Sequence, residues 1–115
     1  MLNNVVLVGR ITKDPELFYT QNKVGYSRFT LAVNRPADKE GERQVDFIDC
    51  IVWRDNAKNL VKYISKGDML GIVGSINIFV NKKDDKTYYN TNITVRELTF
   101  FPKVKESTVD PQEPF

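Results

Sequence analysis

The stretch Asp46-Phe47-Ile48-Asp49-Cys50-Ile51-Val52-Trp53 has large apolar side chains at both even and odd positions. Successive side chains of a β-strand point to opposite faces, so we assign Ile48, Cys50 and Val52 to the core. The opposite face then holds Phe47, Asp49, Ile51 and Trp53, the only tryptophan of the chain. A face that includes a carboxylate is not expected to be buried throughout. Its two aromatic rings therefore need another explanation.

The composition predicts one soluble domain. A chain of 115 residues is long enough for a single hydrophobic core. It has neither an apolar run of about 18 residues nor the layout of a signal peptide. We therefore expect no membrane association and a cytoplasmic location, at the nucleoid or, for a phage-encoded protein, in the host cytoplasm.

Residue types argue against catalysis and metal binding. The chain has no histidine, the commonest general base and zinc ligand, and its single cysteine, Cys50, falls on the predicted core face. Asp46 and Asp49 point to opposite faces, and Asp84-Asp85 lies in a predicted turn. We expect no enzymatic activity, no catalytic residues, no metal and no cofactor.

Charge is distributed unevenly along the chain. Residues 1–103 contain 16 Lys and Arg residues and 12 Asp and Glu residues. Residues 104–115 contain one Lys and three Asp and Glu residues. Apolar periodicity also ends after Phe101-Pro102. We therefore predict a domain over residues 1–103, suited to an anionic ligand, and a short acidic disordered tail over residues 104–115.

Two more strands are predicted before the opening stretch. Residues 3–12 include Val5-Val6-Leu7-Val8, an apolar run that indicates burial on both faces, one of them against another subunit or sheet. A short extended piece follows at residues 17–20. Residues 23–34 alternate, with Phe29, Leu31 and Val33 on one side and Tyr26, Arg28 and Thr30 on the other.

A helix and two strands are predicted after it. Ala57, Leu60, Val61 and Ile64 have helical spacing, with Asp55 as the N-cap and Gly67 at the end. In residues 69–81, we expect Leu70, Ile72, Ile76, Ile78 and Val80 inside and Ser75, Asn77, Phe79 and Asn81 outside. Gly71 and Gly74 predict a bend there. Residues 82–86 form a hairpin tip, and residues 88–98 the last strand.

This order, with one short helix between strands 3 and 4 of five, is that of an OB-fold, an all-β Greek-key barrel. Single-stranded nucleic acid is bound by aromatic rings that stack on bases and by cations that contact phosphates. The outward faces offer both, and we predict this set of DNA-binding residues: Phe47, Trp53, Phe79, Tyr88, Arg10, Arg28, Arg35, Arg54, Lys82, Lys83, Lys86 and Arg96.

Two alternatives stay open on these residues alone. The aromatic rings could seal a subunit interface or cover a barrel end, and this is an even choice for Phe79 and Tyr88. The domain could also be an OB-fold interaction module whose aromatic face binds protein. An enzyme is the least favoured class.

Four blocks resemble the bacterial-type single-stranded-DNA-binding protein family. They are residues 1–17 (MLNNVVLVGRITKDPEL), 29–35 (FTLAVNR), 46–53 (DFIDCIVW) and 63–68 (YISKGD). The resemblance covers roughly residues 1–100 and implies non-specific binding of single-stranded DNA in replication, recombination and repair. It also implies a homotetramer, with a homodimer as the alternative, formed through the first strand, Asn4 to Arg10.

The chain differs from the family pattern at three places. Ala37 and Asn81 stand where family members often have aromatic residues, and Phe79 is our candidate for partial replacement. The acidic tail is short and lacks a linker, which favours a phage- or plasmid-encoded member. The resemblance implies that the tail docks replication or recombination proteins through Asp110, Glu113, Pro114 and Phe115.

Overall fold

A computed structural model describes residues 1–102, which form six strands and one helix. The elements are β1 (Val5–Ile11), β2 (Phe18–Tyr19), β3 (Gly25–Asn34), β4 (Val45–Trp53), α1 (Arg54–Tyr63), β5 (Met69–Lys83) and β6 (Lys86–Phe100). The predicted order of strands and helix is confirmed, and the short piece before residue 21 forms β2. The predicted boundary between domain and tail lies outside the described residues.

The strands form a sheet that closes on itself. Their order is β1-β5-β6-β4-β3-β2, and an additional pairing between β1 and β3 joins the two sides. The pairing of β4 with β6 is parallel and the other pairings are antiparallel. This closed sheet with one helix is the predicted OB-fold.

The core has the alternating pattern that the sequence predicts for β3 and β4. Leu31 of β3 and Val52 of β4 are fully buried, and Cys50 is nearly so. Helix α1 adds Ala57 and Leu60, and its C-cap residue adds Ile64, as the apolar spacing predicts. The opposite face of β4 is thereby left free of core packing.

The helix boundaries differ from the prediction. The N-cap is Trp53, which has extended backbone angles and no side-chain cap, and Asp55 lies in the first turn. The helix ends at Tyr63, before Gly67. The reason is a tight turn: Asp68 accepts a hydrogen bond from the Ser65 amide (2.8 Å), and the Gly67 amide donates to the Ile11 carbonyl (2.9 Å). Gly67, at φ 88°, belongs to this turn.

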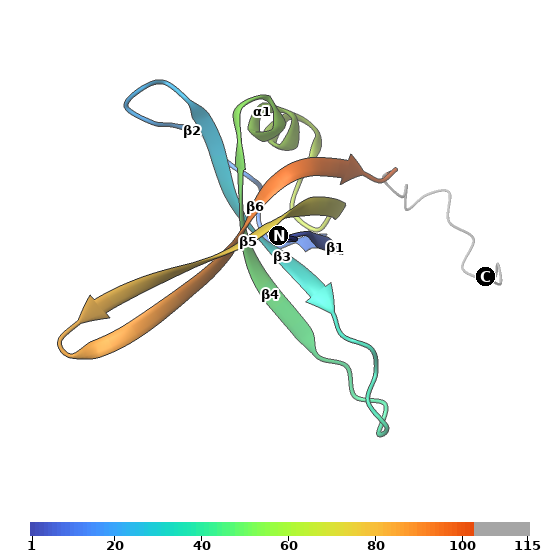
Figure 1. Cartoon of the computed structure of the whole chain (residues 1–115). Coiled ribbons are helices and arrows are strands. Elements are labelled where there is room, and N and C mark those ends of the chain that lie inside the picture. Colours follow the sequence, from blue (N-terminus) through green and yellow to red (C-terminus); the bar gives the residue numbers. More distant parts are fainter. Residues whose placement is uncertain (103–115) are drawn as a thin grey trace.

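The β5–β6 hairpin projects from the barrel as a two-stranded arm (Figure 1). Asp84 and Asp85 both have positive φ, as a two-residue type I′ turn requires, which confirms the hairpin tip. The strands run to Lys83 and from Lys86, further than the predicted limits at residues 81 and 88.

The predicted burial of Ile76, Ile78 and Val80 is wrong. They are on the face that continues the core, but Ile78 and Val80 are 58% and 57% exposed. β4 pairs with β6 only from Ile93 to Val95, so no third strand within residues 1–102 supports the arm beyond that point. The alternation of apolar residues in β5 predicted the correct face for these side chains. It could not predict the point along β5 at which that face is no longer covered by the core.

A β-bulge sets the direction of this arm. Val73 pairs with Glu97 and Gly74 with Val95, which leaves Arg96 without a partner position in β5. A Cβ atom on Gly74 would overlap the carbonyl oxygen of Thr94. The predicted bend therefore takes the form of a bulge that depends on a glycine at position 74.

Candidate nucleic-acid interface

The outward faces of β3 and β4 form one continuous surface. Their register places Tyr26 opposite Trp53 and Ala32 opposite Phe47, and paired residues share a face. Phe47 is 68% exposed and Trp53 is 37% exposed. The two rings thus lie on the side of β4 opposite to Cys50 and Val52, as the alternation predicted.

Trp53 is the last of three aromatic rings in contact. The ring centroids of Tyr26 and Trp53 are 5.2 Å apart, and those of Phe18 and Tyr26 are 5.8 Å apart. Both separations lie in the range of favourable aromatic pairs. We call these three residues, from β2, β3 and β4, the aromatic ladder.

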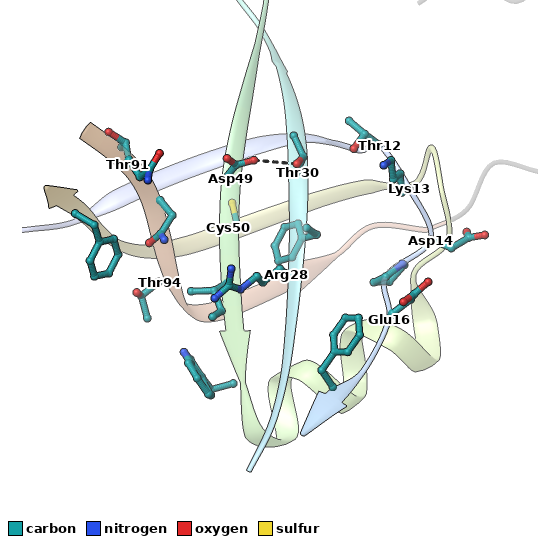
Figure 2. A pocket seen from close by; sticks show the side chains of 18 of the residues that line it. Thr12, Lys13, Asp14, Glu16, Arg28, Thr30, Asp49, Cys50, Thr91 and Thr94 are labelled. Atoms are coloured by element: carbon teal, nitrogen blue, oxygen red, sulfur yellow. Dashed lines mark hydrogen bonds between the residues drawn. The ribbon is translucent and has the colours of Figure 1, made fainter. Parts of the chain in front are cut away.

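The ladder borders a groove of about 960 Å³ between β3, β4, residues 12–18 and β6. Figure 2 shows Arg28 and Asp49 at this space, with Thr91 and Thr94 of β6 on one side and Lys13 to Glu16 on the other. Trp53 and Phe79 also line the groove. The structure therefore brings Arg28, Trp53 and Phe79 together, whereas Phe47 lies further along β4.

The polar side chains in the groove can form hydrogen bonds with base edges as well as with phosphates. Thr30 Oγ1 donates a hydrogen bond to Asp49 Oδ1 (3.0 Å), which holds that carboxylate on the outward face. Asn90 and Asn92 of β6 also line the groove. Amide and carboxylate groups form hydrogen bonds with base edges, whereas Arg28 is suited to a phosphate.

The predicted hairpin residues lie on two faces of the arm. Register places Phe79 opposite Asn90, and Asn81 opposite Tyr88, so Phe79 and Tyr88 share the outward face. Lys83 and Lys86, opposite each other next to the turn, share that face, and Lys82 lies on the other. Phe79 and Tyr88 are about half exposed and available for stacking.

The arginines that were predicted to bind DNA differ in their positions and in their hydrogen-bond partners. Arg10 pairs with Ala32 and so shares the face of Phe47, while its Nη1 donates to the Gly67 carbonyl (2.9 Å). Arg54 follows Trp53 directly, with φ 59°. Arg96, at the bulge, donates to Asn4 Oδ1 and is not among the groove residues.

Arg35 is engaged by a neighbouring carboxylate. Its Nε and Nη2 donate to the two oxygens of Asp46, each at 2.8 Å, and its Nη1 donates to Gln44 (2.9 Å). The hydrogen bonds from Arg35 hold the pKa of Asp46 below its ordinary value. In this structure Arg35 fixes the base of the β3–β4 loop, and these hydrogen bonds occupy three of its five N–H donors.

Cys50 lies directly beneath the groove, on the core side of β4. Burial, with a smaller contribution from the charge of Asp49, raises the pKa of its thiol to about 12. The thiol is therefore neutral at physiological pH and is a weak nucleophile. This agrees with the prediction that Cys50 is a packing residue.

Comparison with known proteins identifies the family. Residues 2–101 match the single-strand binding protein family. The chain belongs to this family. Relatives named single-stranded DNA-binding protein include those of Oceanobacillus iheyensis (46% identical over 102 residues), Halalkalibacterium halodurans (57% over 77) and Bacillus cereus (44% over 102). These matches cover 87%, 66% and 87% of this chain, and 63%, 46% and 60% of the respective relatives.

In this member of the single-strand binding protein family, Ala37 and Asn81, where the resemblance implied aromatic residues, are both exposed. Ala37 is in the exposed loop between β3 and β4, and Asn81 is on the arm, two residues beyond Phe79 and on the same face. Neither side chain can stack on a base as an aromatic ring does. Next to Asn81, the exposed rings on this face of the arm are those of Phe79 and Tyr88.

Sequence reasoning missed two of those rings, Phe18 and Tyr26. Tyr26 was placed correctly on the outward side, but its contact with Trp53 depends on the β3–β4 register. Phe18 lies in a strand of only two residues, which has no periodicity to read. The signal that could have found them is the concentration of rings in the short segment from Phe18 to Tyr26.

No group of three or more His, Cys, Asp or Glu side chains in residues 1–102 is placed to hold a metal ion. Nor does this part of the chain contain a helix of the length and apolar character needed to cross a membrane.

Proposed function

We propose that this chain binds single-stranded DNA without sequence preference and without catalysis, in replication, recombination and repair. The observation that supports it most is the exposed aromatic surface of Phe47 and Trp53, which continues into a groove containing Arg28 and Phe79. Aromatic rings accept any base, and cations contact the phosphates. Family membership and the names of the relatives agree with this function.

Retention of labelled poly-dT on a filter, measured over a range of salt concentrations, tests this function. We expect tight binding at low salt that weakens as salt rises, because cations of the protein displace counterions from the phosphates. A mixed-sequence oligonucleotide should bind with similar affinity, and duplex DNA more weakly. Absence of retained poly-dT at low salt would overturn the proposal.

We also propose that copies of the chain associate through β1, as a homotetramer or a homodimer. Val6 and Val8 lie on the outward face of β1 and are 64% and 49% exposed. β1 pairs with β5 along one edge, but along the other it pairs with β3 only at Arg10 and Ile11. An apolar strand with an open edge favours pairing with a second copy.

Val8→Lys should shift the assembly towards monomers, because burying an unpaired ammonium at the proposed contact is unfavourable. Sedimentation equilibrium of wild type and variant measures this directly. The exposed Val45, at the start of β4, provides the control: Val45→Lys should leave the oligomer unchanged. A wild-type protein that sediments as a monomer at micromolar concentration would contradict the assignment of β1 as an interface.

Residues 104–115, including Asp110, Glu113, Pro114 and Phe115, lie outside the described residues. We propose that they recruit replication or recombination proteins, because their net negative charge is unfavourable for phosphate contact.

Deleting residues 104–115 should leave poly-dT affinity equal or slightly higher, since it removes net negative charge, and should abolish capture of replication or recombination partners. Anisotropy of a labelled oligonucleotide and pull-down with the immobilised protein give the two measurements. Weaker DNA binding after the deletion would mean that the tail contributes to the DNA site instead.

A further inference from the structure

The aromatic ladder has a feature that the core does not explain. Phe18 is 45% exposed and is not part of the buried cluster, although it is one of the two residues of β2. Exposing a phenyl ring to water forgoes the free energy of its burial. The ring nevertheless contacts that of Tyr26, which in turn contacts that of Trp53, in tilted pairs with interplanar angles of 32° and 39°.

A second, shallow pocket of about 270 Å³ lies next to the ladder residues in the chain. Phe18 and Trp53 line the groove, and each ladder residue has a chain neighbour that lines the pocket. Those neighbours are Tyr19, Gly25 and Arg54. Tyr19 and Gly25 face the opposite side of β2 and β3 from the ladder. Because β2 ends the strand order, a polynucleotide that crosses the ladder and turns around the β2 edge would arrive at this pocket.

The charges of the two sites differ in a way that fits such a path. The groove includes Lys13 and Arg28 but also three carboxylates, those of Asp14, Glu16 and Asp49. The pocket includes the cations Lys23, Arg54 and Lys58 and a single carboxylate, that of Asp55. Cations thus exceed carboxylates in the pocket, where phosphates following the stacked bases would be located.

We propose that single-stranded DNA continues out of the groove over Tyr26 and Phe18, which form a further base-stacking subsite, with the next phosphate at Lys23, Arg54 and Lys58. This subsite rests on the proposed single-stranded DNA binding and extends it beyond Trp53. It adds the exposed ring of Phe18 to the stacking surface that Phe47 and Trp53 provide.

A length series of labelled oligo-dT, from about 4 to 16 nucleotides as for single OB folds, tests the subsite by fluorescence anisotropy. Phe18→Ala should weaken binding of the shortest oligonucleotides least, because Phe18 only borders the groove in which they lie. It should bind those long enough to reach β2 roughly 5- to 150-fold more weakly, the range for one stacked base. Phe18→Leu should behave like Phe18→Ala, because leucine keeps the apolar contact with Tyr26 but has no aromatic face.

The same series separates stacking from support of Trp53. If Phe18 only positions Trp53, Phe18→Ala would weaken binding equally at every length and change Trp53 emission in the free protein. Phe18→Leu would then bind as wild type does. This set of results would overturn the proposal. Wild-type affinity at every length would overturn it too. Tyr63→Ala, which removes an exposed ring of α1 beside Phe100, is the matched control and should bind as wild type.

The proposed phosphate contacts of the second pocket are tested by the salt dependence of binding. The double variant Lys23→Gln, Lys58→Gln should reduce the slope of log K against log salt by roughly 0.7 for each phosphate that the variant no longer neutralises. The reduction should be absent with the shortest oligonucleotides. If the slope of log K against log salt were unchanged at all lengths, the DNA would not pass through the pocket. If wild type itself fails to bind any dT, the proposed function fails, which is distinct from failure of the subsite.

Discussion

Replacing Trp53 with alanine should weaken poly-dT binding by roughly 5- to 150-fold, because a stacked base contributes about 1–3 kcal/mol. The expected loss lies towards the upper end of this range. Trp53 lines the groove and contacts Tyr26 of the ladder, so its removal affects two adjoining parts of the surface. The variant has no tryptophan, so affinity is measured by anisotropy of a labelled oligonucleotide.

Three controls make that result specific. Circular dichroism should show a folded variant, because Trp53 is not part of the buried core. Tyr63→Ala should keep wild-type affinity, since Tyr63 lies at the end of α1 against Phe100. Phe47→Ala should weaken binding as Trp53→Ala does. Unchanged DNA affinity in both β4 variants, combined with loss of a protein complex, would instead support an interaction module.

Gly74→Ala should lower the free energy of unfolding by about 1–3 kcal/mol, because its methyl group would meet the Thr94 carbonyl, which is backbone and cannot rotate away. For a domain of this size the melting temperature should fall by roughly 5–20 °C. The bulge also directs the arm that places Phe79 at the groove, so poly-dT affinity should fall as well.

Gly25→Ala is the matched control for this substitution. Gly25 is also a buried strand glycine, but a Cβ atom there would lie 3.5 Å from Leu17 and 3.6 Å from Tyr19, which is ordinary contact. Its melting temperature should stay close to that of wild type. Equal stability of the two variants in a thermal melt would show that the Gly74 bulge adapts to a side chain.

The sequence predicted the surface of β4 because one simple rule applied there. Alternation separates Phe47 and Trp53 from Cys50 and Val52, and the exposures follow that division. The same rule placed Ile78 of β5 on the correct face. It could not predict exposure, because that depends on where β4 stops pairing with β6, a property of three strands together.

Contacts between distant segments were beyond sequence reasoning. The pairing of Phe18 with Tyr26 and of Tyr26 with Trp53 is fixed by strand register, which alternation within one strand does not define. The salt bridge between Arg35 and Asp46 likewise joins the two ends of a loop. The ring contacts and the salt bridge were missed because each joins residues of different strands. Each also changes which side chains are available to a ligand.

The most direct test of base stacking on the β4 face is the fluorescence of Trp53 during titration with poly-dT at low salt. Because the chain has one tryptophan, the signal reports on this position alone. We expect saturable quenching that added salt reverses. Saturable binding of poly-dT, measured in parallel by anisotropy, with no change in Trp53 emission would contradict stacking at this site.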